Sequence, residues 1–395
     1  MNAKTFADSL AFVACLTALP LGATCWSAPA GAQAYRWPLP ARTITALPAM
    51  PTGTAVVARD GGAGLRFGNE AVFTFGDTAL SRPNSTGSQW VVNSMYHTRD
   101  LDASNGIAGG YNYRTFGYPA LQWLGYTQAE IDQNAVWAQE SAQNHTPLKQ
   151  VGLWPTSGMR IGNAQYLWFG KVIETAGGGI EGLGAGFVQV TSATAPTTRI
   201  THRPEATDGE PEIVFTAEEG GYGNAVAVSG NLVFAYWGST EAWDWGNVRL
   251  AFARTDDGPD ADSSPDCFLR SNWWFYDADA PFGATQDAAA ATILFADGAQ
   301  GSVEWNPYLN GWVYTYLGVF SSKVRMRFAD QPYGPWSEPV DVIDAKLGSQ
   351  GELPYFAKAQ KILEQENGRT MYVTYSVGGA IGTGSGVNMV KLRFQ

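Results

Sequence analysis

Short stretches in which aromatic and β-branched residues alternate with small or polar residues recur along the chain, and most of them end on glycine. This composition and a period of two residues are typical of half-buried β-strands. The pattern predicts strands at 71–76, 165–170, 232–238, 312–318 and 371–376. Because one unit recurs, we expect a repeat architecture.

Each of these strands follows a turn that contains Asn and Gly, and a more irregular segment precedes each turn. Asn and Gly accept the positive φ angles that tight hairpins require, so these sites predict hairpins. The turns lie at 67–69, 161–163, 229–231, 309–311 and 366–368. A third strand is expected at 248–253, 324–329 and 387–394.

Five copies of this unit fill residues 51–395, and four-stranded, hairpin-linked sheets at this spacing suit a β-propeller. We therefore expect an all-β fold, a five-bladed β-propeller with loop insertions, as a single domain over residues 35–395. A β-sandwich is the alternative, since it also uses many short strands. Residues 98–150 do not fit the repeat and are predicted to be an insertion at the top face. Within it, Thr127 and Glu130 form the pattern of a helix capping box.

The balance of charged residues indicates which class of binding partner is not expected. The chain has 25 Lys and Arg against 36 Asp and Glu, a formal net charge of −11. Affinity for nucleic acid depends mainly on clustered Lys and Arg, so a nucleic-acid partner is not expected. The many aromatic residues favour a packed core over disorder.

The first 34 residues have the features of a secretory signal peptide: Lys4, an apolar run from 10 to 23, and small residues ending at Ala34. We expect cleavage after Ala34 and a secreted or periplasmic protein. The apolar run is shorter than a membrane span and is broken by Pro20, and no later stretch qualifies, so no membrane partner is expected. A short buried segment and a lipoprotein anchor at Cys25 are the alternatives. Cleavage would leave Cys267 without a disulfide partner.

Carboxylates in the irregular segments that precede the turns are the candidate catalytic residues. In a propeller the first strand of each blade lines the central axis, so polar side chains there converge. Asp60, Glu304 and Glu352 lie in such segments, and Asp77 directly follows the strand at 71–76. Glycoside hydrolysis needs a carboxylic acid and a second carboxylate in one cleft, and crowded carboxylates raise each other's pKa. For each of them, capping a turn or pairing with Arg is the alternative.

Other polar and aromatic side chains are expected to line the funnel around the central axis, together with these carboxylates, and to bind substrate there. They are Asn93, His97, Thr156, Tyr222, Asn224 and Asn306. Several tryptophans could stack on sugar rings or belong to the core: Trp90, Trp154, Trp273 and Trp274. The three histidines share no metal-ligand spacing, and no His-Glu-x-x-His or Cys-x-x-Cys occurs, so no metal site is expected. The chain also lacks the Gly-x-Ser-x-Gly elbow of α/β-hydrolases and the phosphate-binding loop of nucleotide enzymes.

Several segments resemble a known family. They are Phe73-Thr-Phe-Gly-Asp77-Thr78, Trp90-Val-Val-Asn93-Ser94, Trp154-Pro-Thr156-Ser-Gly158, Gly220-Gly-Tyr-Gly223 and Trp305-Asn306-Pro-Tyr-Leu-Asn-Gly-Trp312. They look like the domain-of-unknown-function family 4185, whose members are grouped as glycoside hydrolase family 183. The segment from Phe328 to Ser337 is similar to one shared by many five-bladed propeller glycosidases.

This resemblance implies an endo-acting hydrolase of D-arabinan, the furanose polymer of arabinogalactan and lipoarabinomannan. The acidic pair of the family would correspond to Asp60 and Asp77. No cofactor is expected, and a structural calcium ion on the axis, which propeller glycosidases often hold, stays open. Two other functions stay open: a lectin-like protein that binds a polysaccharide without cleaving it, and a hydrolase of another pentosan.

Overall fold

The computed structural model describes residues 39–395 except 53–55, 84–87, 113–122, 177, 240–243, 257–264, 299, 350 and 379–385. The predicted signal peptide lies outside the described residues. Strands dominate the described chain, which contains one α-helix, so the expected all-β class is confirmed. No helix in these ranges is long and apolar enough to cross a membrane.

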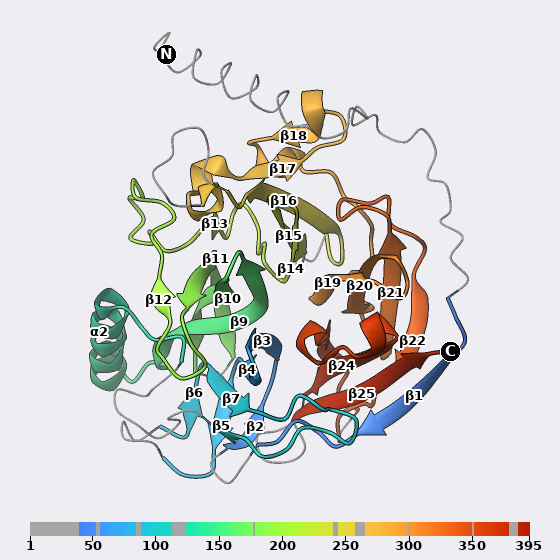
Figure 1. The fold of residues 1–395 in the computed structure, drawn as a ribbon. Coiled ribbons are helices and arrows are strands. Elements are labelled where there is room, and N and C mark those ends of the chain that lie inside the picture. The colour runs from blue at the N-terminus through green and yellow to red at the C-terminus, as the bar shows by residue number, and fades with distance from the viewer. Residues whose placement is uncertain are drawn as a thin grey trace.

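Five antiparallel sheets of four or five strands lie around a common centre (Figure 1). The first sheet has the order β3 (Ala63–Phe67), β4 (Glu70–Phe75), β7 (Ser94–Thr98) and β8 (Tyr111–Asn112). The second has β9 (Lys149–Ile161), β10 (Ala164–Thr175), β11 (Gly179–Val190) and β12 (Thr198–Arg199), with β13 (Phe215–Thr216) beside β11. The third has β14 (Ala225–Ser229), β15 (Leu232–Gly238), β16 (Val248–Arg254), β17 (Trp274–Tyr276) and β18 (Ala284–Thr285).

The fourth sheet has the order β19 (Gly301–Asn306), β20 (Gly311–Leu317), β21 (Lys323–Ala329) and β22 (Val340–Asp344). The fifth has β23 (Pro354–Ala359), β24 (Thr370–Val377), β25 (Gly386–Phe394) and β1 (Arg42–Leu47). A separate small sheet consists of β2 (Val56–Arg59), β5 (Thr78–Leu80) and β6 (Trp90–Val91).

The hydrophobic core is divided among the interfaces between neighbouring sheets. Five clusters of buried side chains lie between successive sheets, and one of them joins the fifth sheet to the first. Representative pairs, from the first interface to the last, are Val72 with Leu167, Trp168 with Ala235, Phe234 with Tyr314, Val313 with Val373, and Tyr372 with Phe73. Each sheet therefore buries both of its faces, which explains why its strands are so rich in aromatic residues.

Four of the five predicted hairpins are confirmed. The β3–β4, β9–β10 and β14–β15 hairpins turn at residues 68–69, 162–163 and 230–231, and β19 is joined to β20 by residues 307–310. The fifth turn is present, since Gln365 and Thr370 pair in an antiparallel bridge across it and Asn367 and Gly368 have positive φ angles, but it is part of a longer connection between β23 and β24. This connection holds two short 3₁₀ helices, η5 (Lys361–Leu363) and η6 (Glu366–Gly368). Other 3₁₀ helices are η1 (Asp266–Phe268), η2 (Arg270–Asn272), η3 (Pro281–Gly283) and η4 (Ala288–Ala290).

The predicted helix start is confirmed. Helix α2 (Gln128–Asn144) begins after Thr127, and Thr127 and Glu130 cap each other's backbone N–H groups. The Glu130 carboxylate also contacts the Lys171 ammonium at 2.7 Å and the Arg199 guanidinium at 3.0 Å, which ties the helix to the second sheet. Figure 1 places α2 at the outer edge of the molecule, away from the common centre.

Candidate active site

Asp60 and Asp77 lie side by side where two paired segments of the chain pass from the small sheet into the first sheet. Arg59 pairs with Thr78 in the small sheet, and Ala63 pairs with Thr74 in the first sheet. Between these pairs the Asp60 N–H donates to the Asp77 carbonyl at 3.3 Å. The structure therefore brings together the two carboxylates that the sequence placed 17 positions apart.

Gly76 allows the two aspartates to approach. Its N–H donates to the Asp60 carbonyl at 3.0 Å, and a Cβ at this position would lie 2.7 Å from Asp60 Oδ1. Gly61 has a φ of +77°, which side chains rarely adopt, and its N–H donates to Ser376 Oγ at 2.8 Å. These glycines leave room for the Asp60 carboxylate and hold its backbone against the fifth sheet.

A third carboxylate, Glu174, reaches the same place from β10 of the second sheet. Trp154 Nε1 lies 3.1 Å from Asp77 Oδ1 and 2.8 Å from Glu174 Oε1, so one indole N–H is shared by two carboxyl groups. Gln150 Nε2 donates to the other oxygen of Glu174 at 2.7 Å. We call Asp60, Asp77 and Glu174 the carboxylate cluster.

The fifth sheet supplies one further contact to the carboxylate cluster. The Tyr355 hydroxyl donates to Asp60 Oδ2 at 2.9 Å, while the Tyr355 side chain stays 36% exposed. The three carboxylates and Trp154 are all half-buried. The cluster is therefore accessible to solvent, and residues from the small sheet and the second and fifth sheets surround it.

The surroundings raise the pKa values of both aspartates. Burial raises the pKa of Asp60 to about 6, and the Glu174 charge adds to this effect, while the Tyr355 hydrogen bond opposes it. Burial, followed by the charges of Glu174 and Asp60, raises the pKa of Asp77 further above its ordinary value. Because like charges this close cannot all ionise, Asp77 keeps its proton near neutral pH, while Asp60, whose pKa is lower, is ionised.

Glu304 does not belong to this cluster. It lies in β19 with its carboxylate buried, and Glu304 Oε2 has no hydrogen-bond partner among the described residues. Burial raises the pKa of Glu304 to about 8, and the charged groups that act on it are Lys361 and Glu364. Neither Asp60 nor Asp77 is among them, so the structure does not bring Glu304 to the predicted pair.

Glu352 lies nearer to the cluster, in the loop before β23. Its backbone carbonyl accepts a hydrogen bond from the Gly348 N–H at 2.8 Å. Both Glu352 and Tyr355 flank Gly378, which places Glu352 next to the tyrosine that contacts Asp60. Glu352 is half-buried and belongs to the rim around the cluster.

Five of the six residues expected to bind substrate are engaged with the protein itself. Asn93 bonds to the backbone of Leu124 and Leu153, Asn306 bonds to Gly368 and Leu309, and Thr156 donates to the Gly223 carbonyl. His97 and Tyr222 are buried, His97 3.4 Å from Glu70 and Tyr222 in an aromatic cluster with Phe215 and Phe275. Thr156 and Asn306, which lie in first strands, thus join neighbouring sheets, a use that the sequence pattern does not distinguish from ligand binding.

The sixth residue, Asn224, participates through its backbone in a buried contact with Lys358. The Lys358 ammonium extends from β23 and donates to Ser157 Oγ at 3.1 Å, to the Gly301 carbonyl at 2.6 Å and to the Asn224 carbonyl. Burial lowers the pKa of this lysine to about 7. One side chain of the fifth sheet therefore joins the second, third and fourth sheets.

The described residues contain no group of three or more His, Cys, Asp or Glu side chains that could hold a metal ion. Cys267 is buried within the third sheet's core and forms no disulfide. Burial lowers the pKa of His202 to about 4, and its ring nitrogens contact the carbonyls of Phe268 and Phe187. These side chains therefore have structural contacts of their own, away from the carboxylate cluster.

The sequence pattern did not identify Glu174 or Tyr355, and it indicated only stacking or packing for Trp154. Glu174 lies four residues beyond Gly170, where the aromatic repeat predicts that the strand has ended. In the structure β10 continues to Thr175, and this extension carries Glu174 to Asp77. The sequence pattern did not indicate that β9 and β10 are unusually long, and for this reason it did not identify Glu174.

Comparison with known proteins agrees with this fold. No curated protein matches the chain. A protein of Bacteroides ovatus ATCC 8483, described as a candidate hydrolase, has a similar structure with a TM-score of 0.53 and 12% identity over 87% of each chain. At this identity the likeness concerns the fold alone.

Two weaker structural likenesses are to glycosidases. The α-L-arabinofuranosidase PaAbf62A from Podospora anserina, in complex with cellotriose, gives a TM-score of 0.47 and 10% identity over 90% of this chain and 98% of that one. CoXyl43, a GH43 β-xylosidase/α-arabinofuranosidase from a compost metagenome, gives 0.46 and 11% over 90% and 95%. The family model described as Domain of unknown function (DUF4185) matches residues 52–377, and the chain therefore belongs to this family.

Proposed function

We propose that this protein is a glycoside hydrolase whose catalytic groups are Asp60, Asp77 and Glu174. The observation that carries the proposal is the shared Trp154 N–H, which holds Asp77 and Glu174 together beside Asp60. Glycoside hydrolysis requires a protonated carboxyl group that donates to the leaving oxygen and an ionised carboxylate that attacks the sugar or activates water. The cluster offers both protonation states in one accessible place.

The raised pKa values suggest the roles. Asp77, which keeps its proton beside the Glu174 charge, is the source of the general acid. Asp60, with the lower pKa and an ordered hydrogen bond from Tyr355, is the carboxylate that acts as nucleophile or base. Tyr355 and Trp154 position these carboxylates and present their rings beside the approaching sugar.

We propose a furanoside polysaccharide as substrate, and D-arabinan in particular. The family resemblance to glycoside hydrolase family 183 implies this polymer, and the negative net charge agrees with an uncharged glycan. The five sheets that share cores in cyclic order support their interpretation as a five-bladed propeller. The signal-like N-terminus supports export to the compartment that holds such polymers.

The test is incubation of the purified protein with D-arabinan, L-arabinan and xylan, followed by chromatography of the products. We expect new oligosaccharides from D-arabinan and a loss of about 10³-fold or more in the Asp77→Asn and Asp60→Asn variants. Products from L-arabinan or xylan alone would replace D-arabinan with another pentosan. Binding of the polymer without any product would favour the lectin-like function and overturn the proposal.

A further inference from the structure

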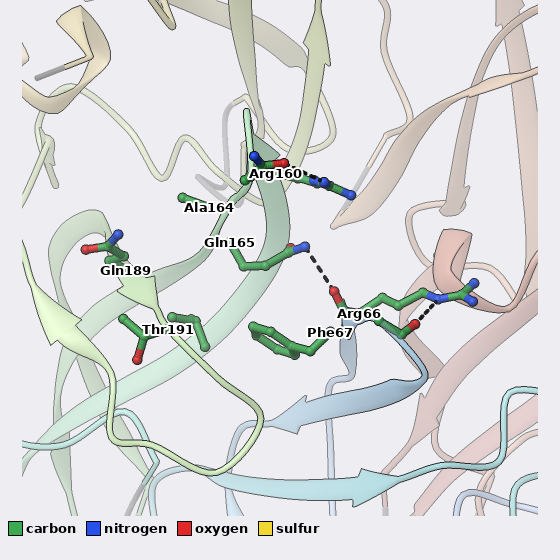
Figure 2. A pocket seen from close by; sticks show the side chains of 10 residues that line it. Arg66, Phe67, Arg160, Ala164, Gln165, Gln189 and Thr191 are labelled. Atoms are coloured by element: carbon green, nitrogen blue, oxygen red, sulfur yellow. Dashed lines mark hydrogen bonds between the residues drawn. The ribbon is translucent and has the colours of Figure 1, made fainter.

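A groove of about 440 Å³ lies at the turns of the β3–β4 and β9–β10 hairpins (Figure 2). The carboxylate cluster lies toward the other end of these strands, because Asp60 precedes β3 and Glu174 lies near the end of β10. Six residues of extended strand separate Trp154 from Arg160, which corresponds to roughly 20 Å. The groove is therefore a place distinct from the proposed catalytic site.

Two arginines, Arg66 and Arg160, line the groove from neighbouring sheets, and both are exposed. Within the described chain neither guanidinium forms a salt bridge with a carboxylate, whereas most other arginines of the described chain do. In a protein of net charge −11, two unneutralised guanidinium groups on one groove form a local positive site.

The backbone fixes both guanidinium groups in the same way. Each arginine stands two residues before a turn glycine of positive φ, Gly68 or Gly162, and donates through Nε to that glycine's carbonyl at 3.0 Å and 2.9 Å respectively. This bond orients the planar groups and leaves the Nη atoms of Arg66 without a hydrogen bond to the described chain. Oriented guanidinium groups bind oxyanions through paired N–H donors.

The remaining lining suits a sugar. Gln165 Nε2 donates to the Arg66 carbonyl at 3.0 Å, a bond that crosses between the first and second sheets (Figure 2). Asn163 Oδ1 accepts a hydrogen bond from Arg160 Nη2 at 3.2 Å and helps to hold that guanidinium. Gln189 and Thr191 line the groove on the side away from the two guanidinium groups, and the half-buried Phe67 adds an apolar surface (Figure 2). A volume of about 440 Å³ lies in the range of small-molecule sites.

We propose that this groove binds a sugar that carries an oxyanion, a phosphate or a carboxylate. Arg66 and Arg160 would hold the oxyanion, while Gln165, which lies between them in Figure 2, would bond to a hydroxyl group. Such a site gives the protein a point of attachment to an acidic sugar that is separate from the carboxylate cluster and from its proposed uncharged substrate.

The experiment is isothermal titration calorimetry of the full-length mature protein with four probes: ribose 5-phosphate, galacturonate, inorganic phosphate and ribose. We expect one of the two acidic sugars to bind more tightly than phosphate or ribose, and its affinity to fall as salt is added. The double variant R66Q/R160Q should weaken this binding about 10-fold or more.

The charge-matched control is R369Q/R393Q, which removes two arginines from the fifth sheet, both beside Glu366. It should keep the affinity of the wild-type protein within about two-fold, since these side chains lie outside the groove. Equal binding by wild-type protein and R66Q/R160Q, or no binding of either acidic sugar, would overturn the proposal. The measurement is independent of hydrolysis, so it separates this site from the proposed catalytic function.

Discussion

Asp77 and Glu304 are both acidic side chains whose pKa values rise because they are buried, but they differ in what surrounds them. Asp77 shares an indole N–H with Glu174 and lies beside Asp60, in a place that solvent reaches. Glu304 is buried, one of its oxygens has no partner in the described chain, and Lys361 and Glu364 are its charged neighbours. A raised pKa alone therefore does not distinguish the two residues, whereas a neighbouring carboxylate and access to solvent do.

The largest expected effect comes from comparing a Glu-to-Gln substitution in the carboxylate cluster with the same substitution at Glu304. Glu174→Gln removes a charge from the cluster and with it one reason for Asp77 to keep a proton. We expect hydrolysis of D-arabinan to fall about 10²-fold or more. Glu304→Gln, a change of equal size outside the cluster, should leave the rate within about two-fold. Initial rates at pH 6 with equal amounts of folded enzyme give the comparison.

The opposite ranking would place the chemistry at Glu304 and would remove Glu174 from the mechanism. Circular dichroism of both variants controls for folding. If both variants keep the wild-type rate while Asp77→Asn is inactive, Glu174 has no catalytic role and Asp77 alone carries the proton.

A smaller effect is expected from Tyr355→Phe, which removes one hydroxyl and keeps the ring. The Tyr355 hydrogen bond favours the ionised form of Asp60, so its loss raises the pKa of Asp60 above about 6. Because the proposed role of Asp60 needs the ionised form, the acidic limb of the kcat/KM profile should move to higher pH. An unchanged limb with a lower rate would mean that Tyr355 contributes only to binding.

The smallest effect concerns stability. The folded-state pKa of Glu304 is about 8, compared with an ordinary value of 4.5, so the folded protein binds more protons than the unfolded chain between these values. The contribution of this group to stability is complete below pH 4.5 and is lost as the pH rises through 8. Glu304→Gln should therefore remove part of the fall in Tm between pH 5 and pH 8, by about a few degrees. Identical pH profiles of Tm for the two proteins would contradict the burial argument.

Local signals in the sequence predicted much of the fold. Alternating aromatic residues identified the second strand of every large sheet, and Asn-Gly turns identified four hairpins. Strand β1 was missed because it lies outside the repeat and pairs with β25, more than 300 residues away. The small sheet was missed because its strands are only two to four residues long.

Only part of the candidate site was predicted, because some of its residues are brought together by the arrangement of the sheets and not by local pairing. Asp60 and Asp77 flank strands of one hairpin, so their proximity follows from local pairing. Glu174 and Tyr355 come from two other sheets, and only the arrangement of sheets around a centre brings them together. Asn93, Thr156 and Asn306 have the polarity of ligand-binding residues, but their bonds to backbone atoms of neighbouring segments became visible only in three dimensions.

The pairing of β1 with β25 has a consequence for how the chain matures. Six backbone positions of β1, from Arg42 to Leu47, lie opposite Phe394 to Met389. The outermost strand of the fifth sheet is thus separated along the chain from its partner by the strands of the other four large sheets. Because β1 cannot pair before β25 has been synthesised, the fifth sheet is completed only after the strands of the other large sheets have been made.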